Sequence, residues 1–535
     1  MKSLDAIPET RDSAGLPQSA AHSGRGLNGT ANRWLQAMER HQRVVLVVFS
    51  IVYFALTCYR ASRKLFWFDE LFTVYLARLP DFKSVWRAVV NGVDFNPPLF
   101  YLITRFSEHI LGEGHIAARL PAILGFWIFC ICLFRFVSLR LSVVSACVGM
   151  LFPLVTGAYF YAYEARAHGV VLGFCGLALV SWQAAADRAA RRAWWLLALG
   201  GSLACALLTH SYAFLIFAPI VLGELSRTMS RKRLDWPLWT TIAASSLAVL
   251  ASIPFVHRVT SGVGAYFPAN LPDLIILYAS LLMPAAGVLA GWLVLTFLVR
   301  VKTESPGHEP GLRGYELFAL WAFLAIPVFA YLAARLTGGP FLARYAISAV
   351  AGFAGLLGVA VAKRPAAGIG TLLLLAGQIG FAFLGFAAGS VLTEPSSGYE
   401  ISTRIREFSQ RYEWLAEDRT LPILLIDDLD FMTTSYYAPA GVAPQLVYVV
   451  WPKWDLMGKG YARLQSCCKA EPAVFGLADF LASHGAFLVY GGPRSADRLK
   501  YFAGDGATVK MRRETRDHFL ALVTYPQRMA KASPR

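Results

Sequence analysis

The stretch that decides the fold is VVLVVFSIVYFALTCY at residues 44–59, followed at once by RASRKLFWFDE at residues 60–70. The first part is an apolar run, and a helix rising about 1.5 Å per residue needs roughly 20 such residues to cross about 30 Å of hydrocarbon. Further apolar runs lie at 120–137, 142–162, 169–186, 194–209, 212–225, 237–256, 274–299, 316–334, 346–362 and 367–392. We therefore predict an α-helical polytopic membrane protein with about eleven transmembrane helices.

The overall composition supports this prediction. Of 535 residues, 56% are hydrophobic and 16% are charged, whereas soluble globular chains are about 45–50% apolar and about 25% charged. The composition excludes an intrinsically disordered chain, a disulfide-dense secreted scaffold and a purely cytosolic enzyme. The net charge of +16 comes from short basic clusters between apolar runs, so we expect no nucleic-acid partner. The eight cysteines show no metal-ligand spacing.

Basic residues in the loops predict the orientation. With the N-terminus in the cytoplasm, the inner loops carry 14 Lys and Arg in 45 residues and the outer loops 12 in 96, as the positive-inside rule requires. Arg60, Arg63 and Lys64 run against this rule. Residues 1–33 are rich in Ser, Gly and Ala and predict a disordered cytoplasmic tail. An odd number of spans then places the C-terminal segment outside the cytoplasm.

The chain changes character after the last apolar run. We predict a transmembrane domain at 34–392 and a small extracytoplasmic α/β domain at 393–535, where charge returns and apolar runs shorten. Four short runs are typical of strands, at 421–427, 445–450, 486–490 and 519–523. Helical stretches are expected near 400–415, 430–438 and 476–483.

The first outer loop, residues 60–119, holds the most informative residues. Asp69 and Glu70 follow aromatic residues suited to the membrane interface, and three short interfacial helices are expected, at 70–79, from Asp81 onward, and at Leu99–Leu111. A carboxylate beside apolar walls can act as a general base toward a hydroxyl. The alternative is that Asp69 caps the helix and Glu70 favours its dipole.

Three later segments on the same face carry polar groups. They are Tyr161–Arg166 with Glu164 and Arg166, Thr209–Tyr212 with His210, and Gly338–Tyr345 with Arg344. Taken singly, they are also compatible with a surface Glu–Arg pair, a His at a polar turn and an arginine reaching lipid headgroups. Together they place acid, base and cation where an anionic lipid-linked substrate would bind.

The order of these motifs resembles a known family. Phe-Asp-Glu after the first span, Asn-Pro-Pro-Leu-Phe-Tyr-Leu at 96–102, Ala118-Arg119-Leu120-Pro121-Ala122 and Tyr-Glu-Ala-Arg at 163–166 are similar to bacterial relatives of the protein O-mannosyltransferases. These include the lipopolysaccharide galacturonosyltransferases and the aminoarabinose transferase of lipid A, which are GT-C glycosyltransferases. The resemblance extends over about residues 40–225 and, as topology, to 392.

The resemblance implies transfer of a sugar from a polyprenyl-phosphate carrier to a lipid, glycan or protein acceptor, outside the cytoplasm at the bacterial inner membrane. It makes Asp69 the base and Glu70 the residue that orients the base or the acceptor. Charge developing on the phosphate leaving group needs cations, for which Arg166 and Arg344 are candidates. Such a transfer would invert the anomeric centre.

The predicted binding set also includes Glu164, His210 and Tyr345. Some relatives have a lysine before the first-loop proline, where this chain has Asn96, so that phosphate contact is missing or comes from elsewhere. We expect no cofactor; a divalent metal is not demanded, although a carboxylate pair could hold one.

Two other functions agree less well with the sequence. A transporter or flippase would need polar groups near the bilayer midplane, but the predicted spans have almost no internal charge. Asp428-Leu429-Asp430 matches the Asp-x-Asp metal motif of nucleotide-sugar transferases. A match of three residues is weak support, and this segment is expected to lie on the side of the membrane away from cytoplasmic nucleotide sugars.

Overall fold

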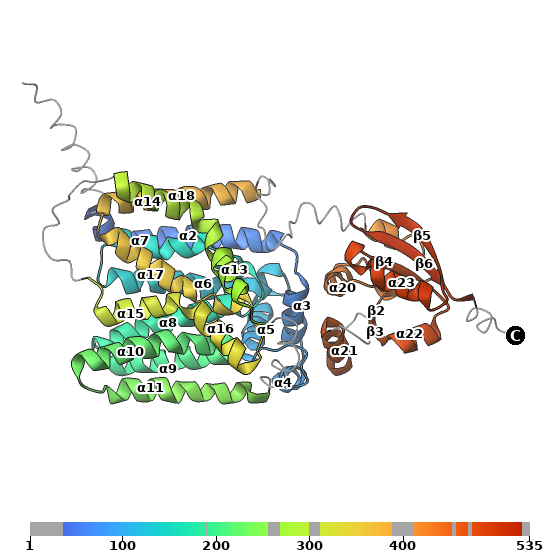
Figure 1. Cartoon of the computed structure of the whole chain (residues 1–535), viewed down its shortest axis with the longest axis horizontal. Coiled ribbons are helices and arrows are strands. Elements are labelled where there is room, and N and C mark those ends of the chain that lie inside the picture. The colour runs from blue at the N-terminus through green and yellow to red at the C-terminus, as the bar shows by residue number, and fades with distance from the viewer. Residues whose placement is uncertain are drawn as a thin grey trace, which may run out of the picture.

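The computed structural model describes residues 36–188, 190–254, 268–298, 311–387, 411–451, 456–468 and 473–526. Figure 1 shows a body of roughly parallel helices beside a smaller sheet unit. The helices of the body are α2 (Gln42–Arg63), α6 (His115–Ser138), α7 (Val143–Leu151), α8 (His168–Ala186), α9 (Arg192–Thr209), α10 (Phe217–Arg231), α11 (Trp236–Ser246), α13 (Leu271–Leu282), α14 (Ala286–Leu298), α15 (Gly314–Leu324), α16 (Ile326–Thr337), α17 (Ala349–Ala362) and α18 (Pro365–Ala387). The predicted tail at 1–33 lies outside the described residues.

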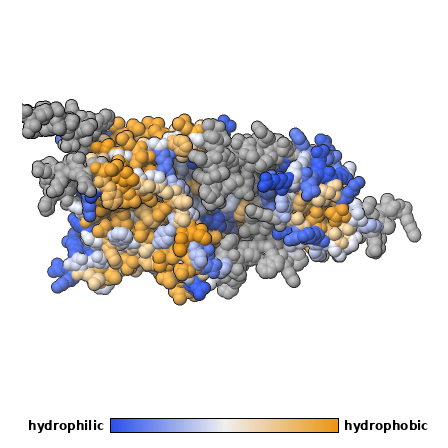
Figure 2. All heavy atoms as spheres, turned by 45° about the horizontal axis from the view of Figure 1, so that its top comes forward, coloured by the Kyte–Doolittle hydropathy of each residue, from blue (hydrophilic) through white to orange (hydrophobic). Residues whose placement is uncertain are grey.

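These helices make the chain a multi-pass membrane protein. Within the described ranges, seven helices are long and apolar enough to cross a membrane, or up to nine if each of two bent pairs is one span. The bent pairs are Val143–Val155 with Gly157–Tyr163, at 75°, and Gly314–Leu324 with Ile326–Thr337, at 53°. Figure 2 shows apolar side chains over much of the visible surface of the body. The number eleven stays a prediction.

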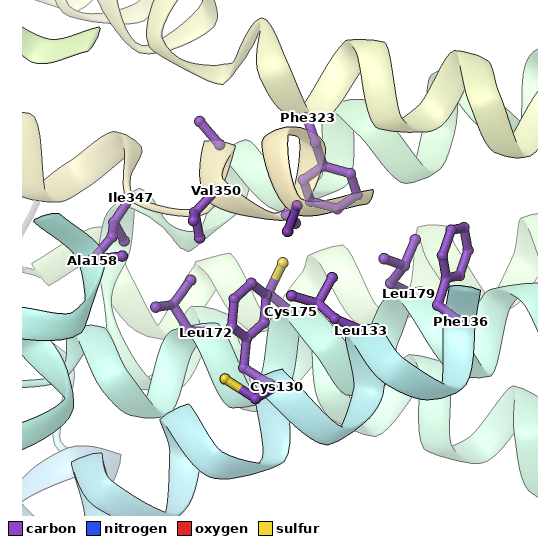
Figure 3. Close-up of a cluster of buried hydrophobic side chains, with 14 of the residues drawn as sticks. Cys130, Leu133, Phe136, Ala158, Leu172, Cys175, Leu179, Phe323, Ile347 and Val350 are labelled. Atoms are coloured by element: carbon purple, nitrogen blue, oxygen red, sulfur yellow. The ribbon is translucent and has the colours of Figure 1, made fainter. Parts of the chain in front are cut away.

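Small residues let the central helices α6 and α8 approach closely. A Cβ on Gly125 would lie 2.4 Å from the carbonyl oxygen of Gly169, and one on Gly173 would lie 2.7 Å from that of Gly125. Around this contact the apolar side chains of α6 and α8 meet those of α15 and α17, as Figure 3 shows for Leu133 and Phe323. The core therefore fixes the starting points of α6 and α8, where the charged residues described below lie.

The three short helices expected in the first loop are confirmed. They are α3 (Phe68–Ala77), α4 (Phe82–Val90) and α5 (Leu99–Leu111). Asp81 caps α4, its carboxylate accepting a hydrogen bond from the Ser84 amide at 2.7 Å. All three lie at the end of the body that faces the sheet unit (Figure 1).

The C-terminal sheet has six strands in the order β3-β2-β1-β4-β6-β5, of which the first four are parallel. The strands are β1 (Ile423–Leu425), β2 (Leu446–Val450), β3 (Ala473–Gly476), β4 (Ala486–Gly491), β5 (Thr508–Glu514) and β6 (Phe519–Thr524), and the helices are α20 (Asp428–Tyr436), α21 (Leu456–Cys468), α22 (Leu477–Ser483) and α23 (Ala496–Gly504). All four predicted strands are present. We did not predict β5, because this edge strand is largely polar and exposed, nor the four-residue β3. Of the helix predicted at 400–415, residues 400–410 lie outside the described residues.

The sheet unit packs against the first-loop helices, with α20 next to α3 and α21 next to α4 (Figure 1). The Phe72 and Tyr461 rings stack with centroids 5.5 Å apart. Tyr437 Oη accepts a hydrogen bond from the Phe66 amide at 2.7 Å and lies 2.6 Å from His115 Nε2. The sheet unit thus contacts the segment that leads into Asp69 and Glu70.

The close contact of α6 and α8 yields a stability prediction. Gly125→Ala should destabilise the protein by about 1–3 kcal/mol, because the added methyl meets backbone of α8. Gly201→Ala in α9 is the matched control: nothing lies within 4 Å of its Cβ position, so the better helix propensity of alanine should leave stability equal or higher by about 1 kcal/mol. Thermal unfolding in detergent compares them, and equal melting of the two variants would contradict this packing.

Candidate functional site

Glu70 is the centre of a buried hydrogen-bond network. Arg119 binds its two carboxylate oxygens through Nε and Nη2, both at 2.8 Å, and the Ala165 amide donates to Oε1 at 2.6 Å. Neither Glu70 nor Arg119 is exposed. Burial raises the pKa of Glu70, but the positive charges of Arg119 and Lys64 outweigh it and hold the pKa below its ordinary value. Glu70 is therefore an ionised residue that holds the site together.

Arg119 extends this network to the first helix of the body. Its guanidinium also donates to the carbonyl oxygens of Ala61, Lys64 and Leu65, at 2.5, 2.6 and 3.0 Å. These carbonyls lie at the C-terminal end of α2, where helices leave acceptors without partners. The Arg119–Glu70 pair thus joins the end of α2, the start of α3, the start of α6 and the turn at 164–166.

Asp69 lies beside this pair and faces two other arginines. Its Oδ2 accepts a hydrogen bond from Arg344 Nη1 at 2.8 Å and lies 3.9 Å from Arg166 Nε. Its backbone carbonyl accepts from Arg166 Nη1 at 3.0 Å. Among the described residues, Asp69 Oδ1 accepts no hydrogen bond. The capping alternative for Asp69 is wrong, because Trp67 occupies the N-cap of α3 and its amide donates a hydrogen bond to Glu70 Oε2 at 3.4 Å.

Arg166 is anchored by a residue that the sequence analysis missed. Asp94 Oδ2 accepts from Arg166 Nη1 at 2.9 Å and from Tyr101 Oη at 2.8 Å. Burial acts to lower the pKa of Arg166, but Asp69 and Asp94 outweigh it, so the pKa is raised and the guanidinium stays charged. Asn96 is buried and hydrogen-bonds Tyr101, which places it next to this anchor. The sequence feature that could have pointed to Asp94 is its position as an acidic residue shortly before Pro97-Pro98, where a helix is interrupted.

Glu164 pairs with Lys64, the residue that ran against the positive-inside rule. Lys64 Nζ lies 2.6 Å from Glu164 Oε1 and 4.1 Å from the centre of the Phe160 ring. Glu164 is fully buried, and its Oε2 has no hydrogen-bond partner in the described part of the chain. Burial raises the pKa of Glu164 to about 7. The surface Glu–Arg pair is therefore wrong as an alternative: Glu164 and Arg166 are buried and have different partners.

His210 and Tyr345 belong to an aromatic group next to Arg344. The Tyr345 ring stacks on Tyr212 at 4.3 Å and lies 5.2 Å from the His210 ring, and His168 lies 5.0 Å from His210. His210 Nδ1 accepts a hydrogen bond from the Tyr212 amide at 3.0 Å, so Nε2 carries the proton when the ring is neutral. Burial, then Arg166 and Arg344, lower the pKa of His210 to about 3. His210 is thus a neutral donor at neutral pH rather than a cation.

The structure therefore brings the predicted residues into one neighbourhood. Asp69, Arg166 and Arg344 are in direct contact, and Glu70 and Glu164 lie behind them. In the described ranges, no group of three or more His, Cys, Asp or Glu side chains is placed to hold a metal ion. Asp430 of the Asp-x-Asp pattern lies 3.4 Å from Arg411 in the sheet unit.

The helical body, the short helices of the first loop and the charged cluster at one end belong to a multi-pass membrane protein. No protein-family model matches the chain, and no curated protein sequence matches it significantly. In a structural comparison the chain is similar to ArnT from Cupriavidus metallidurans in the apo state, with a TM-score of 0.52 and 14% identity, over 92% of this chain and 99% of ArnT.

A second ArnT structure, bound to undecaprenyl phosphate, also has a TM-score of 0.52 and 14% identity, over 89% of this chain and 97% of that one. The oligosaccharyltransferase of Archaeoglobus fulgidus has a TM-score of 0.39 at 11% identity, over 89% of this chain and 72% of that one, which is too low to establish a shared fold. The likeness to ArnT confirms the predicted fold class, including a small C-terminal sheet unit.

Glu70 and Asp69 should differ in what they contribute to stability. Glu70→Gln leaves Arg119 buried without its counter-charge, which should cost about 3–5 kcal/mol. Asp69→Asn should cost less than Glu70→Gln, because its partner Arg344 is 25% exposed and Arg166 keeps Asp94 as a counter-charge. Thermal unfolding of the purified variants measures this, and an equally stable Glu70→Gln protein would refute the role given to the pair.

The raised pKa of Glu164 predicts a pH dependence of stability. Because the folded state holds the proton more tightly than the unfolded chain, stability should fall as the pH rises from the ordinary carboxyl value of 4.5 to about 7. Glu164→Gln, which stays neutral, should flatten this slope, while Glu113→Gln at an exposed position should keep it. Unfolding measured between pH 4.5 and 8 checks this, and an unchanged slope in Glu164→Gln would count against it.

Proposed function

We propose that this protein is a membrane glycosyltransferase that moves a sugar from a polyprenyl-phosphate carrier to a lipid, glycan or protein acceptor. The observation that carries the proposal is the contact of Asp69 with Arg166 and Arg344 at one end of the helical body. It places a carboxylate that can take a proton beside cations that can bind a phosphate. The fold supports it, because ArnT shares this fold and one of its structures contains undecaprenyl phosphate.

In the proposed reaction, Asp69 accepts the proton of the acceptor hydroxyl. The acceptor oxygen then forms a bond to the anomeric carbon, while the bond from that carbon to the carrier phosphate oxygen breaks. Polyprenyl phosphate leaves with the electron pair, and attack opposite the leaving oxygen inverts the anomeric centre. Arg166 and Arg344 stabilise the charge that develops on the phosphate.

The remaining residues have supporting roles in this proposal. Glu70 fixes the position of Asp69, the preceding residue on α3, through Arg119 and Ala165. The neutral His210 and the Tyr345 ring are better suited to contact a sugar than to neutralise a phosphate. Asn96 adds no positive charge, and Lys64, which lies nearby, is paired with Glu164. No step needs a metal ion.

The site is proposed to face outward from the bacterial inner membrane, with the N-terminus in the cytoplasm, the transmembrane domain at 34–392 and the extracytoplasmic domain at 393–535. The loop charges support this orientation. The transporter alternative would need charged groups near the midplane. On α6, the described charges lie near its ends, at His115, Arg119 and Arg135, which favours catalysis at one face.

The proposal predicts that Asp69 is required for transfer. Asp69→Asn should lower the turnover by about 10²-fold or more, the usual contribution of a general base, with the protein still folded and inserted. Mass spectrometry of envelope glycolipids and glycoproteins in deletion, wild-type and Asp69→Asn strains measures the product. A sugar mass should be missing in the first and third strains at normal protein levels.

The matched control is Asp273→Asn, which removes the same charge from the start of α13, where this carboxylate accepts a hydrogen bond from Asn270 and forms no ion pair with a described arginine. This strain should keep the sugar mass. A normal product in the Asp69→Asn strain would remove Asp69 as the base. A product unchanged by deletion of the protein would refute the glycosyltransferase function.

A further inference from the structure

The candidate base is bound by one of the cations proposed to bind the carrier. Arg344 Nη1 lies 2.8 Å from Asp69 Oδ2. A carboxylate oxygen that accepts a hydrogen bond from a guanidinium is occupied, and a guanidinium that serves a carboxylate is less available to a phosphate. In this arrangement, Asp69 Oδ2 and Arg344 Nη1 are engaged with each other, and the second oxygen, Oδ1, accepts no hydrogen bond among the described residues.

The two arginines are held very differently. Arg166 is 7% exposed and is fixed by both the Asp69 carbonyl and the Asp94 carboxylate. The Arg344 side chain is 25% exposed, donates a hydrogen bond to Asp69 and lies 5.8 Å from the centre of the neighbouring Tyr345 ring. Its buried Nε has no hydrogen-bond partner in the described part of the chain. Arg344 can therefore change partner without disturbing the rest of the site.

Arg344 also comes from a part of the chain remote from α3. It lies in the short helix η7 (Ala343–Ala346), which follows α16 and the turn at Gly338, where φ is 68°. Asp69 is positioned independently of this segment, through its own carbonyl and through Glu70 on the same helix. Loss of the Arg344 contact thus leaves the Asp69 backbone in place.

We propose that Arg344 acts as a latch on the base: the carrier phosphate and the Asp69 carboxylate compete for its guanidinium. Before the carrier binds, Arg344 holds Asp69 Oδ2. The phosphate offers several oxygens to the planar guanidinium, draws Arg344 toward itself and leaves Asp69 free to accept the acceptor proton. Binding of the donor thus uncovers Asp69 Oδ2, the oxygen that Arg344 occupies in its absence. This inference rests on the proposed function.

Competition between the phosphate and Asp69 for Arg344 predicts the opposite effect on carrier binding from an ion pair that only holds Arg344 in place. If the two anions compete, Asp69→Asn removes one competitor, and the inactive protein should bind undecaprenyl phosphate more tightly than the wild type. If Asp69 merely orients Arg344 for the phosphate, the same variant should bind equally well or more weakly. Binding of undecaprenyl phosphate to the full chain in detergent separates the two cases.

The experiment compares the wild type with Asp69→Asn, Arg344→Gln and the double variant. We expect Asp69→Asn to bind about fivefold more tightly, the size of a partly exposed ion pair. Arg344→Gln should bind more weakly than the wild type, and adding Asp69→Asn to it should give no gain. Asp273→Asn, with the same change of net charge, should bind like the wild type. Thermal unfolding confirms that each variant is folded.

Three results would overturn the latch. The first is unchanged or weaker binding of undecaprenyl phosphate by Asp69→Asn. The second is the same gain in affinity when Asp69→Asn is added to Arg344→Gln, and the third is an equal gain in Asp273→Asn. The second and third would indicate a general effect of charge. Wild-type binding with normal sugar transfer would leave the proposed function standing in each case. Failure of the wild type to bind the carrier would overturn the proposed function and the latch together.

Discussion

The buried pair of Arg119 and Glu70 is the interaction on which the candidate site depends. Arg119 binds a carbonyl at the end of α2, its ion pair with Glu70 joins the starts of α6 and α3, and Glu70 accepts a hydrogen bond from the turn at 164–166. Removing one member would leave an uncompensated charge in an apolar core, which costs far more than a surface pair is worth. The close packing of α6 on α8 through Gly125 and Gly173 supports the pair from the other side. The site is therefore rigid where it is anchored.

The charged neighbourhood is balanced before any substrate arrives. The carboxylates Asp69, Glu70, Asp94 and Glu164 face the cations Lys64, Arg119, Arg166 and Arg344. Adding an anionic phosphate to such a set needs either a free cation or a change of partner, and the more exposed Arg344 is the member best placed to change. Glu164, whose pKa is about 7, can also change its charge near neutral pH.

Much of the fold could be predicted because apolar patterning is local. The bounds predicted for Leu99–Leu111 agree with α5, and the four apolar strands were found. In the site, Asp69, Arg166 and Arg344 were predicted from motif order and lie in contact. Asp94, Lys64 and His168 were missed, because each looks like an ordinary loop or helix residue until distant segments meet. Glu70 was expected to orient the base or the acceptor, but its partners Arg119 and Ala165 could not be found from the sequence, because they lie on distant segments.

The sequence by itself determined the apolar helices, the interfacial helices and the residue types available for chemistry. These follow from hydrophobicity and spacing, which act over a few turns of chain. Only the tertiary structure decided which carboxylate is held ionised and buried, which arginine is the more exposed and which histidine is neutral. Those properties come from burial and from charges on segments hundreds of residues apart, such as Asp69 and Arg344. Electrostatic interactions depend on distance in space and on the surrounding dielectric, neither of which is encoded locally in the sequence.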